Sequence, residues 1–120
     1  MPRVLGLVLS LAVGGGAQTP AQGGGACTIT YVANAGVLFE TDGQKFLFDA
    51  LIREGISPYA TPTMEQRRSL ESATAPFDNV TAILITHWHE DHFSAEAVAA
   101  HLRSSPSTRL VSSAEVVQRV

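Results

Sequence analysis

Three histidines and two carboxylates are concentrated in one short stretch of the chain. The stretch, called the metal run below, reads Thr86-His87-Trp88-His89-Glu90-Asp91-His92. Imidazole and carboxylate groups are the side chains that bind zinc and similar divalent ions in proteins. So many polar groups are costly to bury in a core unless they are paired or bound to a metal. The composition of the run therefore predicts a metal site.

The spacing within the run predicts how its side chains divide between ions. In an extended backbone, His87 and His89 project to the same side and can reach one ion, whereas on a helix they would point about 200° apart. Asp91 and His92 come where the chain bends toward the next helix, so they can face a second position. Two ions roughly 3.5–4 Å apart would form a hydrolytic site. Asp91 could bind the second ion and orient the nucleophile or accept its proton, so it is the candidate catalytic residue.

The two intervening residues alternate to the other side of an extended run. We expect Trp88 to serve packing rather than substrate contact, and Glu90 to be solvated or to support a metal ligand. The helical zinc motif His-Glu-x-x-His is absent, because His89-Glu90-Asp91-His92 is one residue short of it.

A predicted strand and a predicted helix flank the metal run. Residues 80–85 are apolar and partly β-branched, which is typical of a buried strand. Ser94 is a suitable N-cap for a helix over 95–103. On that helix, His101 is predicted to be exposed near the C-terminal end. The run would thus follow the carboxyl end of a strand, a usual place for ligand sites in α/β folds.

An antiparallel meander is predicted upstream of the metal run. Residues 28–32, 37–40 and 45–49 have the alternating or apolar patterns of strands. Asp42-Gly43, between the last two, suits the positive φ angles of a tight hairpin turn. Asp49 closes the third strand. The pattern leaves two interpretations of Asp49 open: a cap that bonds nearby backbone amides, or a carboxylate at the rim of the sheet near the metal.

The remaining elements complete an α/β order. Thr63 could cap a mostly polar helix over 64–73, and residues 109–111 are typical of a short strand. Ser112-Ser113-Ala114-Glu115 is a capping box that predicts a last helix, to Val120. The sequence therefore predicts a mixed sheet with flanking helices.

Composition limits the classes of function. A chain of 120 residues is long enough for one domain at most. Its net charge of -3 gives no basic surface for nucleic-acid phosphates. The single cysteine, Cys27, excludes an internal disulfide and a cysteine-based zinc site.

The N-terminus is typical of an export signal. Arg3 precedes a short apolar core over 4–13, which is too short to span a bilayer comfortably, and Gly15-Gly16-Ala17 would suit a signal peptidase. A membrane anchor is the alternative. A lipoprotein signal ending at Cys27 is disfavoured, because the expected leucine before the cysteine is missing.

These features predict three segments. We expect a signal peptide over 1–17, a Gly/Ala-rich linker over 18–26 and a folded domain over 27–120. The mature protein would be secreted or periplasmic, with no membrane span after cleavage.

The metal run, with its flanking strand and helix, resembles the His-x-His-x-Asp-His signature of the metallo-β-lactamase-fold hydrolases. The resemblance covers about residues 28–120 and implies an αββα sandwich. It implies that His87 and His89 bind a first ion and that Asp91 and His92 bind a second. The ions would be Zn²⁺, or other divalent metals. Asp49 looks like the family's first acidic position, a support for the metal ligands, which favours the rim interpretation.

The sequence departs from the family pattern after the metal run. The family supplies a further histidine to the first metal, a bridging aspartate and a final histidine to the second metal. Here the only other histidine is His101. We therefore expect the chain to be a truncated first half of the sandwich.

Two functions follow from these patterns. The first is an exported zinc-dependent hydrolase, in which a metal-activated water attacks an ester, lactone, amide or phosphodiester bond of a small-molecule or phosphodiester substrate. The second is an inactive metal-binding fragment, or a half-domain that needs a partner chain. Two protein ligands per metal are fewer than the three of most catalytic zinc sites. A sheet with an apolar face must bury that face against something, so the isolated chain is expected to be poorly folded or to associate.

Overall fold

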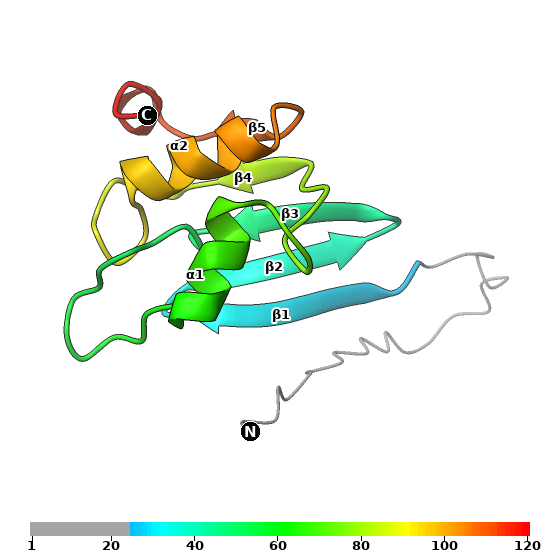
Figure 1. Cartoon of the computed structure of the whole chain (residues 1–120), viewed down its shortest axis with the longest axis horizontal. Helices are drawn as coiled ribbons and strands as arrows, with labels where there is room; N and C mark the ends of the chain where they lie inside the picture. Colours follow the sequence, from blue (N-terminus) through cyan, green and yellow to red (C-terminus); the bar gives the residue numbers. More distant parts are fainter. Residues whose placement is uncertain (1–24) are drawn as a thin grey trace, which may run out of the picture.

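The computed structural model describes residues 25–120, which form one mixed sheet with helices against it (Figure 1). The predicted signal peptide, 1–17, and most of the predicted linker lie outside the described residues. The strand order is β1-β2-β3-β4-β5. In chain order the elements are β1 (Cys27–Ala33), β2 (Gly36–Thr41), β3 (Gln44–Phe48), α1 (Met64–Glu71), β4 (Ala82–Leu84), α2 (Ala95–Ser104), β5 (Arg109–Val111) and α3 (Ala114–Val117).

The first three strands form the predicted antiparallel meander. Thr41 pairs with Gln44, so a two-residue turn joins β2 to β3. Asp42 and Gly43 fill this turn with φ angles of 47° and 75°. Both angles lie in the left-handed region that a tight hairpin turn needs and that Asp and Gly tolerate. The hairpin prediction is confirmed.

The remaining strands extend the sheet in parallel. β4 pairs with β3, and β5 pairs with β4, each in the parallel sense. Parallel neighbours need crossover connections, and α1 and α2 lie on those connections, both against the same face of the sheet (Figure 1). The carboxyl ends of β3 and β4 therefore lie side by side, which brings the residues after Phe48 next to the residues after Leu84.

The hydrophobic core lies between the sheet and the two helices. Leu38, Leu47 and Ile83 are direct neighbours on β2, β3 and β4, and each is completely buried. Leu70 of α1 and Val98 of α2 belong to the same buried cluster. Burial of this apolar surface is the main force that holds the helices on the sheet.

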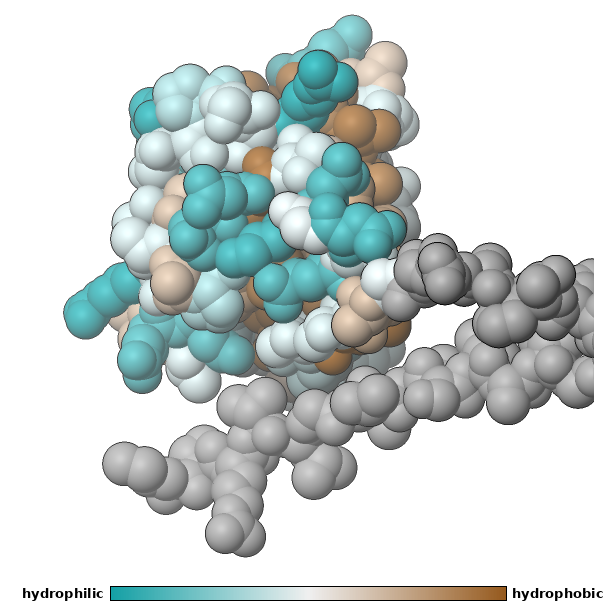
Figure 2. All heavy atoms as spheres, turned by 90° about the vertical axis from the view of Figure 1, so that its right-hand side faces the viewer, coloured by the Kyte–Doolittle hydropathy of each residue, from teal (hydrophilic) through white to brown (hydrophobic). Residues whose placement is uncertain are grey.

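The opposite face of the sheet is apolar but not covered by described residues. Cross-strand neighbours on this face are Ile29, Tyr31, Val37, Phe39, Phe46, Phe48, Leu84 and Val111. Tyr31 is 59% exposed and Ile29 is 42% exposed. In Figure 2, apolar atoms gather along the right-hand side of the molecule, which is the side away from the helices. We call this surface the outer sheet face.

Three predicted elements are shorter in the structure. The helix predicted over 64–73 ends at Glu71, because Ala73 adopts a left-handed φ of 51°. The strand predicted over 80–85 pairs only as Ala82–Leu84, and the last predicted helix ends at Val117. Element ends depend on tertiary hydrogen bonds, which sequence patterns do not contain.

His101 is not exposed, contrary to the prediction. It is completely buried between α2 and α1, and its Nδ1 lies 2.6 Å from the carbonyl oxygen of Leu70. Ser104 donates to the carbonyl oxygen of Glu71 at 3.1 Å. The last carbonyls of a helix have no partners within it, so α2 supplies donors to the end of α1. Burial lowers the pKa of His101.

Within residues 25–120, none of the helices is both long enough and apolar enough to cross a membrane.

Candidate metal centre

The metal run begins one residue after the end of β4 and ends shortly before α2. The carbonyl oxygen of His89 accepts hydrogen bonds from the amides of His92 and Phe93, both at 2.9 Å. This turn folds the second part of the run back toward the first. Phe93 is buried in the core, and the amide of Ser94 donates to Leu51 at 2.9 Å. The loop is therefore anchored at both ends, by β4 and by the core contact of Phe93.

Three side chains of the run converge where a metal could bind. His87, Asp91 and His92 each offer one ligand atom, and these atoms lie within 4.8 Å of one another. Nε2 of His92 lies 3.4 Å from Oδ2 of Asp91. Two ligands bound to a tetrahedral zinc at about 2.0–2.1 Å lie about 3.3–3.4 Å apart. The separation of these two atoms thus fits a shared ion, and all three side chains are half-buried.

Asp49 lies beneath this cluster and holds it in place. Its side chain is 5% exposed, and its φ of 45° turns the chain sharply at the end of β3. Oδ1 accepts from the amide of Thr86 at 2.8 Å, and Oδ2 accepts from the Thr86 hydroxyl at 2.7 Å. Oδ2 also lies 2.8 Å from Nδ1 of His92. Asp49 therefore stands at the rim of the sheet, bonded to a ligand-type histidine, and it also bonds a backbone amide.

These contacts define which nitrogen each histidine presents to the cluster. A carboxylate only accepts hydrogen bonds, so Nδ1 of His92 carries a proton, and in the neutral imidazole the lone pair is then on Nε2. Because the Thr86 hydroxyl donates to Asp49, its oxygen accepts from Nδ1 of His87, 2.9 Å away. His87 is thereby also left with a free lone pair on Nε2. A neutral imidazole held from its other nitrogen is the usual state of a metal-binding histidine.

His89 lies beside the cluster but outside it. Its ring centroid is 4.6 Å from that of His87, as expected for two side chains on the same side of an extended run. The ring centroid of His92 is nearer to that of His87, at 4.1 Å. His89 is exposed, and among residues 25–120 no side chain forms a hydrogen bond with its ring. The structure thus groups His87 with Asp91 and His92, whereas the expected pairs were His87 with His89 and Asp91 with His92.

Sequence reasoning missed two residues at this site. Thr86 links Asp49 to His87, as described above. Asn34, in the turn between β1 and β2, donates from Nδ2 to the carbonyl oxygen of Asp91 at 2.9 Å and lies 3.4 Å from its Oδ2. The position of Thr86 next to a histidine was a usable signal for a supporting hydroxyl. Asn34 offered no signal, because 57 residues separate it from Asp91.

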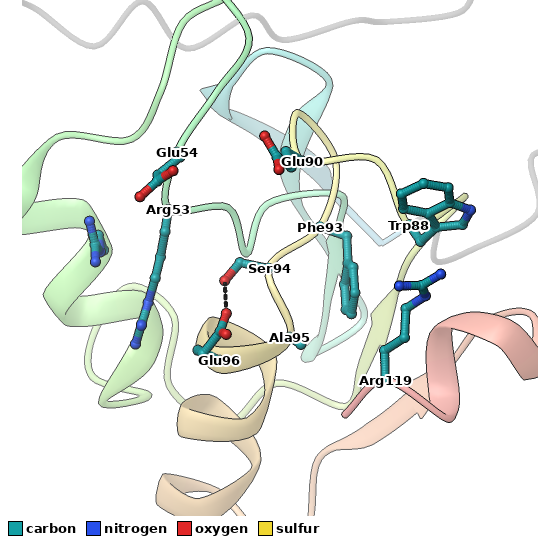
Figure 3. A pocket seen from close by; sticks show the side chains of 10 residues that line it. Arg53, Glu54, Trp88, Glu90, Phe93, Ser94, Ala95, Glu96 and Arg119 are labelled. Carbon is teal, nitrogen blue, oxygen red and sulfur yellow. Dashed lines mark hydrogen bonds between the residues drawn. The ribbon is translucent and has the colours of Figure 1, made fainter.

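A hollow of about 530 Å³ lies on the other side of the run, between α1, the start of α2 and the end of the chain (Figure 3). Trp88 and Glu90 line it, and His87, Asp91 and His92 do not. Trp88 packs against Arg119 at the surface rather than in the core. Trp88 is 42% exposed, and its ring lies 4.5 Å from the guanidinium carbon of Arg119. Glu90 is exposed, in line with the solvated interpretation.

Two cations that line the hollow, Arg53 and Arg67, pair with Glu71 on α1. Arg53 and Glu71 form a bidentate pair at 2.7 and 3.0 Å, and this hydrogen bonding lowers the pKa of Glu71 and raises that of Arg53. Hydrogen bonds from its own backbone amide and from Ser94 lower the pKa of Glu96. The hollow is thus lined by charged side chains of both signs rather than of one sign.

Comparison with known proteins identifies the family of the chain. A family model described as the metallo-β-lactamase superfamily matches residues 29–99, which is more than half of the chain and includes the metal run. No curated protein gave a significant match.

A crystal structure of a protein from Parabacteroides distasonis, provisionally named a metal-dependent hydrolase, has a similar fold. The TM-score is 0.52 and the sequence identity is 21%. The match covers 80% of this chain and 35% of the other, so this chain spans about a third of that protein's length. The mixed sheet with its flanking helices is accordingly part of a metallo-β-lactamase fold. The chain belongs to the metallo-β-lactamase superfamily.

Proposed function

We propose that this chain supplies the first metal-binding residues of a zinc-dependent hydrolase. The observation that carries the proposal is the convergence of His87, Asp91 and His92 within 4.8 Å, on a loop held from beneath by Asp49. Two neutral imidazoles and one carboxylate make a donor set suited to zinc and, more weakly, to other divalent ions.

The residues of the run have separate roles in this proposal. His87 and His89 bind one ion and Asp91 and His92 bind a second, as in the family pattern, with His87 close enough to serve either. A bound divalent ion lowers the pKa of a coordinated water and polarises the group under attack. Asp91 is the candidate catalytic residue, because its carboxylate can orient the attacking water or accept its proton. Asp49 and Thr86 hold the two imidazoles by Nδ1, which orients Nε2 of each ring for metal binding.

The proposed substrates are small molecules with an ester, lactone, amide or phosphodiester bond. Sites of this kind serve many reactions on one fold, so the fold does not choose among them. Because the chain spans only 35% of the similar solved structure, the activity of a whole protein remains part of the proposal.

Metal analysis and hydrolysis assays test the proposal together. The protein is dialysed against Zn²⁺, and bound zinc is measured by plasma mass spectrometry in wild type and in the His87→Ala/His92→Ala double variant. We expect at least one zinc per chain in wild type and none in the variant. Chromogenic acetate ester, lactone, anilide and phosphodiester substrates then report the reaction class. Equal zinc content in both proteins would exclude the run as the metal site.

The outer sheet face supports a second candidate function. An apolar face with Tyr31 at 59% and Val111 at 53% exposure is unusual for a monomeric soluble protein. Such a face suits a half-domain that binds metal but does not catalyse hydrolysis by itself. Hydrolysis would then require another polypeptide to cover the outer sheet face. Zinc binding without turnover of any substrate class would favour this function over the first.

We also propose that residues 1–17 act as an export signal and that residues 18–26 link it to the domain. Expression of the full chain with its own N-terminus in a bacterial host, followed by fractionation and N-terminal sequencing, tests this. We expect a periplasmic or secreted product that begins close to Gln18. A product that retains Met1 in the cytoplasmic fraction would contradict export.

A further inference from the structure

The turn between β1 and β2 makes a specific contact with the metal run. Nδ2 of Asn34 donates to the main-chain carbonyl of Asp91 at 2.9 Å and lies 3.4 Å from Oδ2 of the same residue. One amide group thus contacts both the backbone and the side chain of Asp91. Oδ2 of Asp91 lies the same 3.4 Å from Nε2 of His92. The carboxylate is therefore placed between Asn34 on one side and the imidazole on the other.

The local backbone holds Asn34 in a fixed place relative to the metal centre. Its φ is 46°, a left-handed angle that Asn adopts more readily than most residues. Two residues after Asn34, the backbone at Gly36 packs closely against the backbone of Asp49 and Ala50. A Cβ at Gly36 would be 2.8 Å from the carbonyl oxygen of Asp49 and 2.9 Å from Cα of Ala50, so only glycine fits. The same turn thus braces Asp49 with its backbone and Asp91 with the Asn34 side chain.

A carboxamide is well suited to this contact. Its NH₂ group donates two hydrogen bonds, and a carboxylate and a carbonyl only accept. Because the group is uncharged, it orients the Asp91 carboxylate without cancelling the negative charge that a metal needs. A carboxylate oxygen has two lone pairs, so Oδ2 of Asp91 can accept from Asn34 and still bind the ion that its separation from Nε2 of His92 fits.

We propose that Asn34 is a positioning residue for Asp91 and that it sets the metal affinity of the site through that carboxylate. The inference rests on the proposed function, since it assumes that Asp91 binds metal. Residues that hydrogen-bond metal ligands typically change metal affinity about 10–100-fold when they are removed.

The test uses Asn34→Gly, which removes the carboxamide but keeps the left-handed backbone accessible. Asn79→Gly is the matched control. Asn79 also has a positive φ, of 55°, and its carboxamide donates to Asp78 at 3.0 Å, but it precedes β4 while the metal run follows β4. Zn²⁺ affinity is measured on the full chain by competition with a chromophoric chelator. We expect a loss of about 10–100-fold for Asn34→Gly and less than about twofold for Asn79→Gly.

A double-variant cycle with Asp91→Ala separates positioning from a general structural role. If Asn34 acts through Asp91, Asn34→Gly costs no further affinity in the Asp91→Ala background. The Co²⁺-substituted protein should also show a changed visible spectrum in Asn34→Gly, because the carboxylate binds differently. If Asn34→Gly does not melt cooperatively, Asn34→Asp, which keeps the shape but cannot donate, is assessed by the Co²⁺ spectrum alone. A changed spectrum supports the proposal.

The outcomes separate this inference from the proposed function. Zinc binding in wild type, with equal affinity in Asn34→Gly or an unchanged Co²⁺ spectrum, overturns the role of Asn34 and leaves the metal site standing. If Asn34→Gly lowers zinc affinity equally in the wild-type and Asp91→Ala backgrounds, the role of Asn34 is also overturned, because the effect would then be structural. Absence of zinc from wild type overturns both.

Discussion

Oδ2 of Asp49 lies 2.8 Å from Nδ1 of His92, across 43 residues of sequence. This hydrogen bond joins the end of β3 to the loop after β4, and it exists because those strands are parallel neighbours in the sheet. Asp49 fixes the proton on Nδ1, so the metal-binding nitrogen of His92 faces Asp91 rather than the protein interior. The pairing of β3 with β4 thus decides which nitrogen of His92 faces the metal centre.

Replacing Asp49 by Asn should weaken zinc binding. Asn keeps the shape, but its NH₂ group would face the Thr86 hydroxyl and Nδ1 of His92, which are both donors to the carboxylate. We expect about a 10–100-fold loss of zinc affinity and about 1–3 kcal/mol of lost stability in the metal-free protein. Chelator competition and urea unfolding measure the two effects. Asp42→Asn, the same change in the β2–β3 turn, should leave the zinc affinity unchanged from that of wild type. An equal loss of zinc affinity in Asp42→Asn would contradict a specific role for Asp49.

His92 and His89 should differ in their importance for the first zinc ion that binds. His92 is held by Asp49 and already faces Asp91, whereas His89 is exposed and must be ordered on binding. We therefore expect His92→Ala to reduce the affinity for the first equivalent of zinc at least about tenfold more than His89→Ala does, because pre-organised ligands lose less entropy. Isothermal titration of each variant gives both affinities. A larger loss from His89→Ala would show that the His87–His89 pair fills first.

Stability should fall at mildly acidic pH because of His101. Burial lowers the pKa of His101 below its ordinary value of 6.5, so in that range the unfolded chain binds more protons than the folded chain. The contribution of His101 to stability is complete above about pH 6.5 and is lost as the pH falls through its lower, folded-state pKa.

Urea unfolding of the metal-free protein, with a chelator present, measures this loss. Between pH 8 and pH 5 the free energy of unfolding should decrease more in wild type than in His101→Gln, which cannot take up a proton. Above pH 7 the difference between the two proteins should not depend on pH. Parallel curves over the whole range would show that protonation of His101 is not coupled to unfolding.

The outer sheet face should make the chain self-associate. We expect concentration-dependent oligomers in sedimentation velocity and a shift toward monomer in Tyr31→Lys, because a charge in the contact must be desolvated. Met64→Lys is the control, since Met64 is 62% exposed on α1, on the helix side. Cys27 is exposed and free, so the measurements need a reductant to exclude disulfide-linked dimers. A wild-type protein that sediments as a monomer at all concentrations would contradict the prediction.

Much of the fold was predictable because its signals are local. The Asp42-Gly43 turn, the alternation in the first strands and the Ser94 cap each depend on residues close in sequence, and the structure contains all three. His101 was predicted wrongly because its environment is not local. Its burial depends on α1 lying across α2, and a histidine near the end of a helix gives no sign of that contact.

The sequence by itself determined the type of chemistry. Three histidines and an aspartate within one loop after a strand specify metal-binding groups and their order along the chain. Only the tertiary structure decided how these groups are held. Asn34 reaches the run from the β1–β2 turn and Asp49 from the end of β3, and the parallel pairing of β3 with β4 brings Asp49 beneath His92. The physical reason is that hydrogen bonds fix an imidazole or a carboxylate only over about 3 Å, and only folding brings residues so distant in sequence within that range.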